Sequence, residues 1–105
     1  MARKVVWTDL AVEDLEAAVE FIARDSPAYA SGLAQKVCAA VDSLAEFSNR
    51  GRKLQDPQLS EFREIYVGSY RLIYRVELHR VLIVAIVHGS RDVSRAVSSR
   101  KKRTP

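Results

Sequence analysis

The sequence has little of the residues from which disulfides and metal sites are built. Its 105 residues include one cysteine and two histidines. A single cysteine cannot form a disulfide within the chain, and Cys38 lies beside Val37 and Val41 on an apolar helical stripe, so we predict a buried thiol. Without a cysteine pair or a histidine cluster no metal site is visible, and we predict no metal and no cofactor.

Long hydrophobic runs are also missing. The longest apolar stretch, Val81–Val87, is far too short to cross a bilayer, and the N-terminal MARKVVW lacks the apolar core of a secretion signal. The composition, 48% hydrophobic and 29% charged, is ordinary for one soluble domain. We therefore expect a cytoplasmic protein with a single domain at residues 1–95 and a basic C-terminal tail at residues 96–105.

The charge is distributed unevenly along the chain. The formal net charge is +4, from 17 Lys and Arg against 13 Asp and Glu. Residues 1–49 hold 4 basic and 8 acidic residues, a balance of −4, whereas residues 50–105 hold 13 and 5, a balance of +8. This asymmetry predicts a basic face turned toward a polyanion or an acidic partner, with part of it supplied by the terminal run Arg100–Arg103.

Hydrophobic periodicity predicts two helices after a short first strand. Lys4–Trp7 is β-prone, and Thr8 or Asp9 can cap the helix that follows. Ser26 and Pro27 end that helix and begin a second, because serine caps and proline fits the first helical position. The apolar stripes are Leu15, Ala18, Val19 and Ile22 in the first helix and Ala30, Leu33, Ala34, Val37, Val41, Leu44 and Phe47 in the second. We expect an antiparallel helical hairpin.

The region from Phe62 to Asp92 carries the pattern of three strands, and the polar segment 49–60 before it reads as a loop. In Tyr70–Leu78, alternation predicts a core face (Tyr70, Leu72, Tyr74, Val76, Leu78) and an opposite face with cations (Arg71, Ile73, Arg75, Glu77). After a turn at His79 and Arg80, the stretch 81–87 is apolar on both faces, which predicts a covered central strand. The fold class is α+β, in the order β-α-α-β-β-β, with the hairpin on one face of a mainly antiparallel sheet and the arginine face open.

Two arginines on this sheet could form an anion site. Gly89 lets the backbone turn sharply after the buried strand, so Arg91 can project toward the face that carries Arg71. The alternative is a solvated face in which strand arginines do nothing specific and Arg75 pairs with Glu77. The spacing of the residues does not decide between these two interpretations.

Five short motifs follow one another along most of the chain. They are the opening W-T-x-x-A-x-x-D-L (Trp7, Thr8, Ala11, Asp14, Leu15), the Ser-Pro break, Gly51-Arg52, the strand G-S-Y-R-L-I-Y-R-V and the ending V-H-G-S-R-D. Together they resemble the RelE/ParE superfamily of bacterial type II toxins, over roughly residues 4 to 95. The resemblance implies a growth-inhibiting toxin, used in plasmid stabilization, that a cognate antitoxin neutralises in a hetero-oligomer. It also implies either mRNA in the ribosomal A site or DNA gyrase as the target, and the fold does not choose between them.

The resemblance also implies roles for particular residues. In RelE-like cleavage Arg71 and Arg91 would steady the phosphate. Because an imidazole titrates near neutral pH, His88, beside two arginines, is a substitute candidate for the base; the alternative is a strand-end histidine that is hydrogen-bonded to a backbone carbonyl. Such toxins also use a lysine pair on the preceding strand and a tyrosine near the C-terminus, whereas here that strand reads R-E-I-Y (residues 63–66) and no tyrosine follows Tyr74. Because positioned acid–base groups contribute about 10²–10⁴-fold each, these losses favour a ParE-like inhibitor of DNA gyrase.

Two alternatives remain: a RelE-like ribosome-dependent mRNA endoribonuclease, and a non-toxic basic nucleic-acid-binding module. The predicted residues for binding a target or an anion are Arg63, Arg71, Arg75, Arg91 and Arg95. The predicted residues for binding the antitoxin are Leu15, Val19, Ile22, Leu33 and Val37 on the hairpin.

Overall fold

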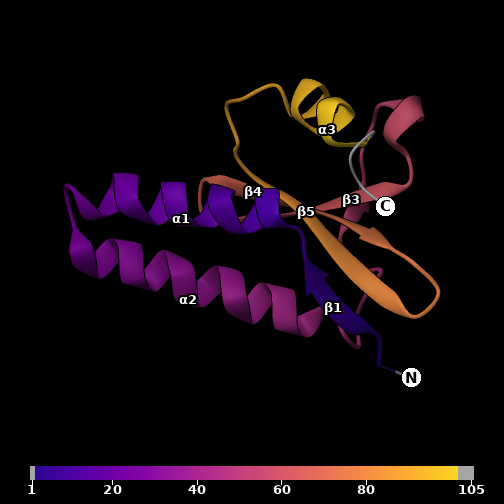
Figure 1. The fold of residues 1–105 in the computed structure, drawn as a ribbon, viewed down its shortest axis with the longest axis horizontal. Coiled ribbons are helices and arrows are strands. Elements are labelled where there is room, and N and C mark those ends of the chain that lie inside the picture. The colour runs from indigo at the N-terminus through magenta and orange to yellow at the C-terminus, as the bar shows by residue number, and fades with distance from the viewer. Residues whose placement is uncertain (1, 102–105) are drawn as a thin grey trace.

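Five strands form one sheet with helices on both of its faces (Figure 1). The computed structural model describes residues 2–101. Its elements are β1 (Lys4–Trp7), α1 (Asp9–Ala23), α2 (Pro27–Ser43), β2 (Arg52–Lys53), a 3₁₀ turn (Pro57–Leu59), β3 (Phe62–Val67), β4 (Tyr70–Val76), β5 (Arg80–His88) and α3 (Val93–Lys101). The strand order is β1-β5-β4-β3-β2, with β1 parallel to β5 and the other pairs antiparallel. The predicted α+β class with a helical hairpin and a mainly antiparallel sheet is confirmed.

The helical hairpin of α1 and α2 begins where the sequence predicts. The Thr8 hydroxyl accepts the amide of Ala11 and donates to the carbonyl of Ile83, so one side chain caps α1 and ties it to the sheet. Ser26 caps α2 in the same way, with Pro27 at the first helical position. Within residues 2–101, no helix combines the length and the apolarity that crossing a membrane requires.

Two predictions on α2 are wrong. The helix ends at Ser43, so Phe47 lies beyond the helical repeat and is 64% exposed instead of continuing the stripe. In the turn that follows, the carbonyl of Ala45 accepts the amide of Arg3. Cys38 is exposed as well. Its neighbour Val37 points into the core, and the next residue of a helix lies about 100° further round the axis.

The sheet has a hydrophobic core on each face. The first core packs the hairpin on the sheet and includes Leu33, Val37, Val41, Leu44, Leu72, Tyr74, Val81 and Ile83. The second includes Leu54, Leu59, Phe62, Ile73, Leu82, Val84, Val93 and Val97. β5 is buried from residue 81 to residue 87, which confirms a central strand covered on both sides.

The prediction that the arginine face is open is wrong, because α3 and the segment around the 3₁₀ turn cover much of this face. Residues 96–101 of the predicted basic tail (96–105) are helical instead, and Val97 is fully buried. Residues 102–105 lie outside the described residues. Leu78 is also 79% exposed rather than on the core face, since β4 ends at Val76.

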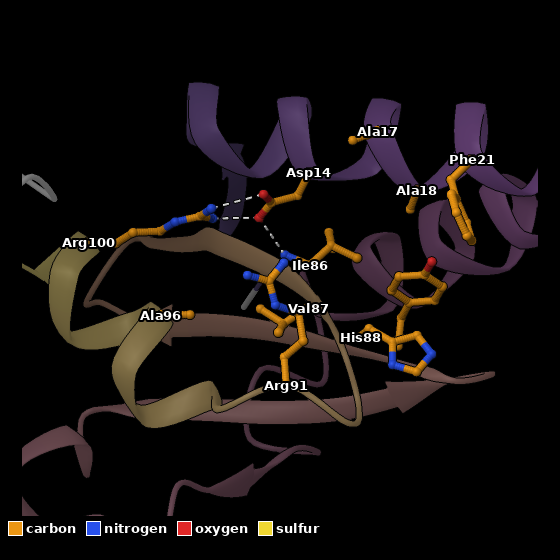
Figure 2. Close-up of a pocket in the computed structure, with 11 residues that line it drawn as sticks. Asp14, Ala17, Ala18, Phe21, Ile86, Val87, His88, Arg91, Ala96 and Arg100 are labelled. Atoms are coloured by element: carbon orange, nitrogen blue, oxygen red, sulfur yellow. Dashed lines mark hydrogen bonds and ion pairs between the residues drawn. The ribbon is translucent and has the colours of Figure 1, made fainter.

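Two side chains complete the outer edge of β5 where β1 stops. β1 pairs only with residues 80–83 of β5. Beyond it, Asp14 accepts the amide of Ile86 at 2.9 Å (Figure 2). Arg100 donates to the carbonyl of Val84 at 3.0 Å. Arg100 also forms a two-point ion pair with Asp14, and this hydrogen bonding raises the pKa of the Arg100 guanidinium. The pair holds α1, β5 and α3 together.

We expect Asp14→Ala to destabilise the protein by about 1–3 kcal/mol, because it removes the acceptor of the Ile86 amide and the carboxylate that pairs with Arg100. The measurement is the midpoint of urea unfolding. Glu16→Ala is the matched control, since Glu16 is an exposed carboxylate on the same helix. Equal midpoints for the two variants would contradict the role of Asp14.

Candidate functional site

Strands β2, β3 and β4 bring together an arginine cluster, defined here as Arg52, Glu64, Tyr66 and Arg71. Arg52 is paired with Glu64 across β2 and β3, and Tyr66 with Arg71 across β3 and β4, so all four side chains share one face. The Glu64 carboxylate contacts Arg52 Nε at 3.0 Å and Arg71 Nη1 at 3.4 Å. The guanidinium carbons of Arg71 and Arg52 lie 5.1 and 5.9 Å from the centroid of the Tyr66 ring.

The anion at the centre of this cluster is more deeply buried than its cations. The Glu64 side chain is 4% exposed, against 24% for Arg71 and 59% for Arg52. Each carboxylate oxygen of Glu64 is bound by a different arginine. Arg71 Nε is buried without a hydrogen-bond partner among the described residues. The cluster therefore has two positive charges and one internal negative charge that is fixed between them.

The loop before β2 is held by Tyr74, which is fully buried in β4. Its hydroxyl accepts the amide of Gly51 at 2.8 Å, and burial raises the pKa of the phenol. Arg63 donates to the carbonyl of Gly51 at 2.7 Å. These contacts place Arg52 beside Glu64 and give a physical reason for the Gly51-Arg52 motif.

We expect Gly51→Ala to destabilise the protein by about 1–3 kcal/mol through overpacking. A Cβ at this position would lie 2.6 Å from the Tyr74 hydroxyl and 2.8 Å from the carbonyl oxygen of Glu64. Gly32→Ala is the control, because a Cβ there meets nothing within 4 Å and alanine favours a helix interior by about 0.5–1 kcal/mol. In chemical unfolding, the midpoint of Gly51→Ala should lie below that of wild type, and the midpoint of Gly32→Ala should lie above it. A Gly51→Ala midpoint at or above wild type would contradict the close contact.

The other predicted catalytic residues line a pocket of about 260 Å³ between α1, β5 and α3 (Figure 2). Arg91 extends along β5 there, near the ion pair of Asp14 and Arg100. His88 is exposed, its Nδ1 lies 2.7 Å from the Ser90 hydroxyl, and its ring meets Tyr70 edge to face at 5.3 Å. Arg71 belongs to the arginine cluster and Arg91 to this pocket, so the two have different surroundings.

The remaining predicted cations are used in different ways. Arg75 pairs with Glu77 and Glu61. This pairing corresponds to the alternative interpretation, in which the strand arginines form no anion site. Arg63 braces the loop before β2 through backbone carbonyls. Arg95 is exposed on α3.

A groove runs along α2 beside the turn between β3 and β4. Three adjoining hollows of about 210, 190 and 420 Å³ form it; the first two share Tyr29 and Leu33, and the last two share Lys36 and Gly68. We call this the hairpin groove. Phe21, 64% exposed, and Tyr29, 61% exposed, flank its first end. Lys36 and Arg50 line its other end.

The predicted antitoxin residues only partly reach this groove. Ile22 and Leu33 line it. Val37 is fully buried and belongs to the core, and Leu15 and Val19 are half-buried. The apolar stripe of a helix serves first to pack it on the sheet, so the stripe itself is not free for a partner.

Comparison with known proteins decides the family. A family model described as "ParE toxin of type II toxin-antitoxin system, parDE" matches residues 5–93. This chain belongs to that family. A curated relative, Toxin RelE2 of Caulobacter vibrioides, is 40% identical over 88 residues, which is 84% of this chain and 97% of the relative. This ParE-family chain is thus a toxin of a type II toxin-antitoxin system within the RelE/ParE superfamily.

Solved structures share the fold of this ParE-family toxin. The structure titled "Chromosomal ParDE TA system from P. aeruginosa" superposes with a TM-score of 0.68 at 21% identity, over 83% of this chain and 96% of that one. The toxin-antitoxin complex RelBE2 of Mycobacterium tuberculosis gives 0.58 at 23% identity, over 84% and 99%. At these identities the likeness concerns the fold alone.

In this ParE-family toxin, sequence reasoning missed the pairing of Glu64 and the exposure of Phe21 and Tyr29. In the sequence, Glu64 is only part of the R-E-I-Y stretch (residues 63–66) that lacks the lysine pair. Phe21 lies beside the apolar stripe of α1, and a large aromatic residue outside a stripe is a signal of exposed apolar surface.

Proposed function

We propose that this ParE-family toxin inhibits DNA gyrase by binding to it, without chemistry of its own. The supporting observation is the pairing of Glu64 with Arg52 and Arg71. Electrostatic catalysis needs a cation that is free to meet the charge developing on the substrate. An arginine already neutralised by a fixed carboxylate is poorly suited to that task.

Acid–base catalysis is also poorly supported at the arginine cluster. The face of β3 that carries Glu64 presents Phe62, which is fully buried, and Tyr66. It therefore has no lysine pair. His88, the candidate base, lies in the pocket beside α1 and is hydrogen-bonded to Ser90 rather than placed beside Arg71.

The antitoxin is proposed to dock in the hairpin groove. Phe21 and Tyr29 provide exposed aromatic surface at one end, where a partner's apolar side chains gain most from burial. Lys36 and Arg50 at the other end suit acidic residues. The bound antitoxin segment is therefore expected to be apolar at one end and acidic at the other.

Two assays test the target. With purified gyrase and relaxed plasmid, the toxin should reduce supercoiling in proportion to its concentration. Primer extension on ribosome-bound mRNA should show no codon-phased cuts. Supercoiling that remains unchanged at saturating toxin would contradict the proposal.

The second candidate function is ribosome-dependent mRNA cleavage. The observation that favours it is the pocket that His88 and Arg91 both line. If the wild type cuts mRNA, Arg91→Ala should lower the rate by about 10²–10³, by analogy with lost oxyanion donors. Cleavage of this kind would replace the gyrase proposal and make His88 the candidate base.

A further inference from the structure

Apart from Glu64, the arginine cluster has the components of a surface that binds single-stranded nucleic acid. Two guanidiniums lie beside the ring of Tyr66, which is 52% exposed. Arginines beside exposed aromatic rings on a sheet are what proteins use to hold the phosphates and bases of single strands. The chain's net charge of +4 would also draw a polyanion toward it.

Glu64 occupies the place that a phosphate would take in this cluster. Its two carboxylate oxygens bind Arg52 and Arg71 from one side chain, as two oxygens of a phosphate would. Arg71 donates from Nη1 to Glu64, while its Nε is buried and has no hydrogen-bond partner among the described residues. Glu64 therefore holds Arg71 in place but leaves its Nε donor unsatisfied.

The carboxylate of Glu64 cannot easily leave the cluster. Its side chain is 4% exposed, and Glu64 is paired across the strands with Arg52 on one side and with Ile73, which is fully buried, on the other. An approaching phosphate would meet a fixed negative charge and would have to compete with it for both arginines. Repulsion and competition both act against binding.

We infer that Glu64 is a specificity-determining residue, which keeps the arginine cluster from binding the phosphates of single-stranded RNA. This inference rests on the proposed function, in which the toxin acts on a protein. It adds that the basic sheet face is prevented from holding RNA by an internal carboxylate and not by a lack of positive charge.

The test is binding of a short fluorescein-labelled single-stranded RNA, measured by anisotropy over a series of KCl concentrations. Glu64→Gln keeps the size of the side chain and removes its charge. If this frees two arginines for phosphates, the slope of log affinity against log salt should steepen by about 1.4, and affinity near 0.1 M salt should rise about 25-fold. The double variant Glu64→Gln/Arg71→Gln should lose about half of the added slope.

Glu61→Gln is the matched control, because Glu61 also pairs with basic side chains, Arg75 and Lys101, but is 38% exposed. It should change RNA affinity much less than Glu64→Gln. Equal affinities for these two folded variants would overturn the inference. This outcome would leave the gyrase assay unaffected, so the two proposals can fail separately.

A third variant keeps the test decisive if Glu64→Gln does not fold. In the presence of Glu64, Arg71 should make no phosphate contact, so Arg71→Gln alone should leave the salt slope of wild type unchanged, although the lost positive charge lowers affinity in general. A slope that becomes shallower by about 0.7 would show that Arg71 already contacts phosphate, and would refute the role assigned to Glu64.

Discussion

Expression of this chain alone should stop the growth of a sensitive bacterial host and abolish colony formation, and co-expression of the cognate antitoxin should restore both. The expectation follows from the family, whose members are toxins of type II systems, and from the basic half of the chain. Under the gyrase proposal the arrested cells should form filaments and induce the DNA-damage response. Immediate loss of protein synthesis would instead indicate the ribosome.

The control for this experiment is the same host that carries the empty vector. Harmless, high-level accumulation of soluble wild-type protein would contradict toxicity in that host. A second host with a different gyrase then separates an inactive toxin from an insensitive target.

Phe21→Ala should weaken the antitoxin complex by about 2–4 kcal/mol, which corresponds to about 30- to 1,000-fold in the dissociation constant. Phe21 is 64% exposed at the rim of the hairpin groove, so an apolar partner would bury most of a large aromatic side chain there. Surface plasmon resonance with immobilised antitoxin measures the effect, mainly as faster dissociation.

Phe47→Ala is the matched control for this prediction. Phe47 is also 64% exposed, but it follows α2 and lines none of the three hollows of the hairpin groove. An equal loss of affinity in both variants would contradict docking in the groove. The wild-type complex should also survive high salt, since apolar contacts are not screened. A complex that separates in modest salt would point to a mainly electrostatic interface.

Much of the fold could be predicted because alternation and helical periodicity report which faces are buried. Tyr70, Leu72, Tyr74 and Val76 lie on the hairpin side, as their spacing predicts. The break in the pairing of β4 with β5, between Ile73 and Tyr74, could not be read in this way, since β5 is apolar on both faces and an extra residue changes no pattern there.

The last helix escaped prediction for a related reason. α3 buries little besides Val93 and Val97, and its other side chains are small or basic, so its composition resembles a solvated tail. What fixes α3 is tertiary: its two valines join the second core, and Arg100 reaches Asp14, which is 86 residues earlier in the chain. Periodicity within a short segment carries no information about such a distant partner.

The site was harder to predict than the fold because pairing depends on register. The alternation placed Arg71 on the face opposite the core, but the sequence did not show that Glu64 and Tyr66 would share this face with it. The charge balance of the second half of the chain also overstated the available positive charge. Several of those arginines are neutralised within the domain by Glu64, Glu77 or Asp14.

The ion pair of Asp14 and Arg100 also has a consequence for how copies of this toxin meet one another. An exposed strand edge is a template to which a second chain can add a strand. The part of β5 beyond its pairing with β1, residues 84–88, would be such an edge, and it is flanked by apolar residues. Asp14 accepts the amide of Ile86 and Arg100 donates to the carbonyl of Val84, so neither backbone group remains to pair with another molecule. Loss of either side chain would thus do more than loosen the fold: it would open a site for aggregation through the most apolar strand of the protein.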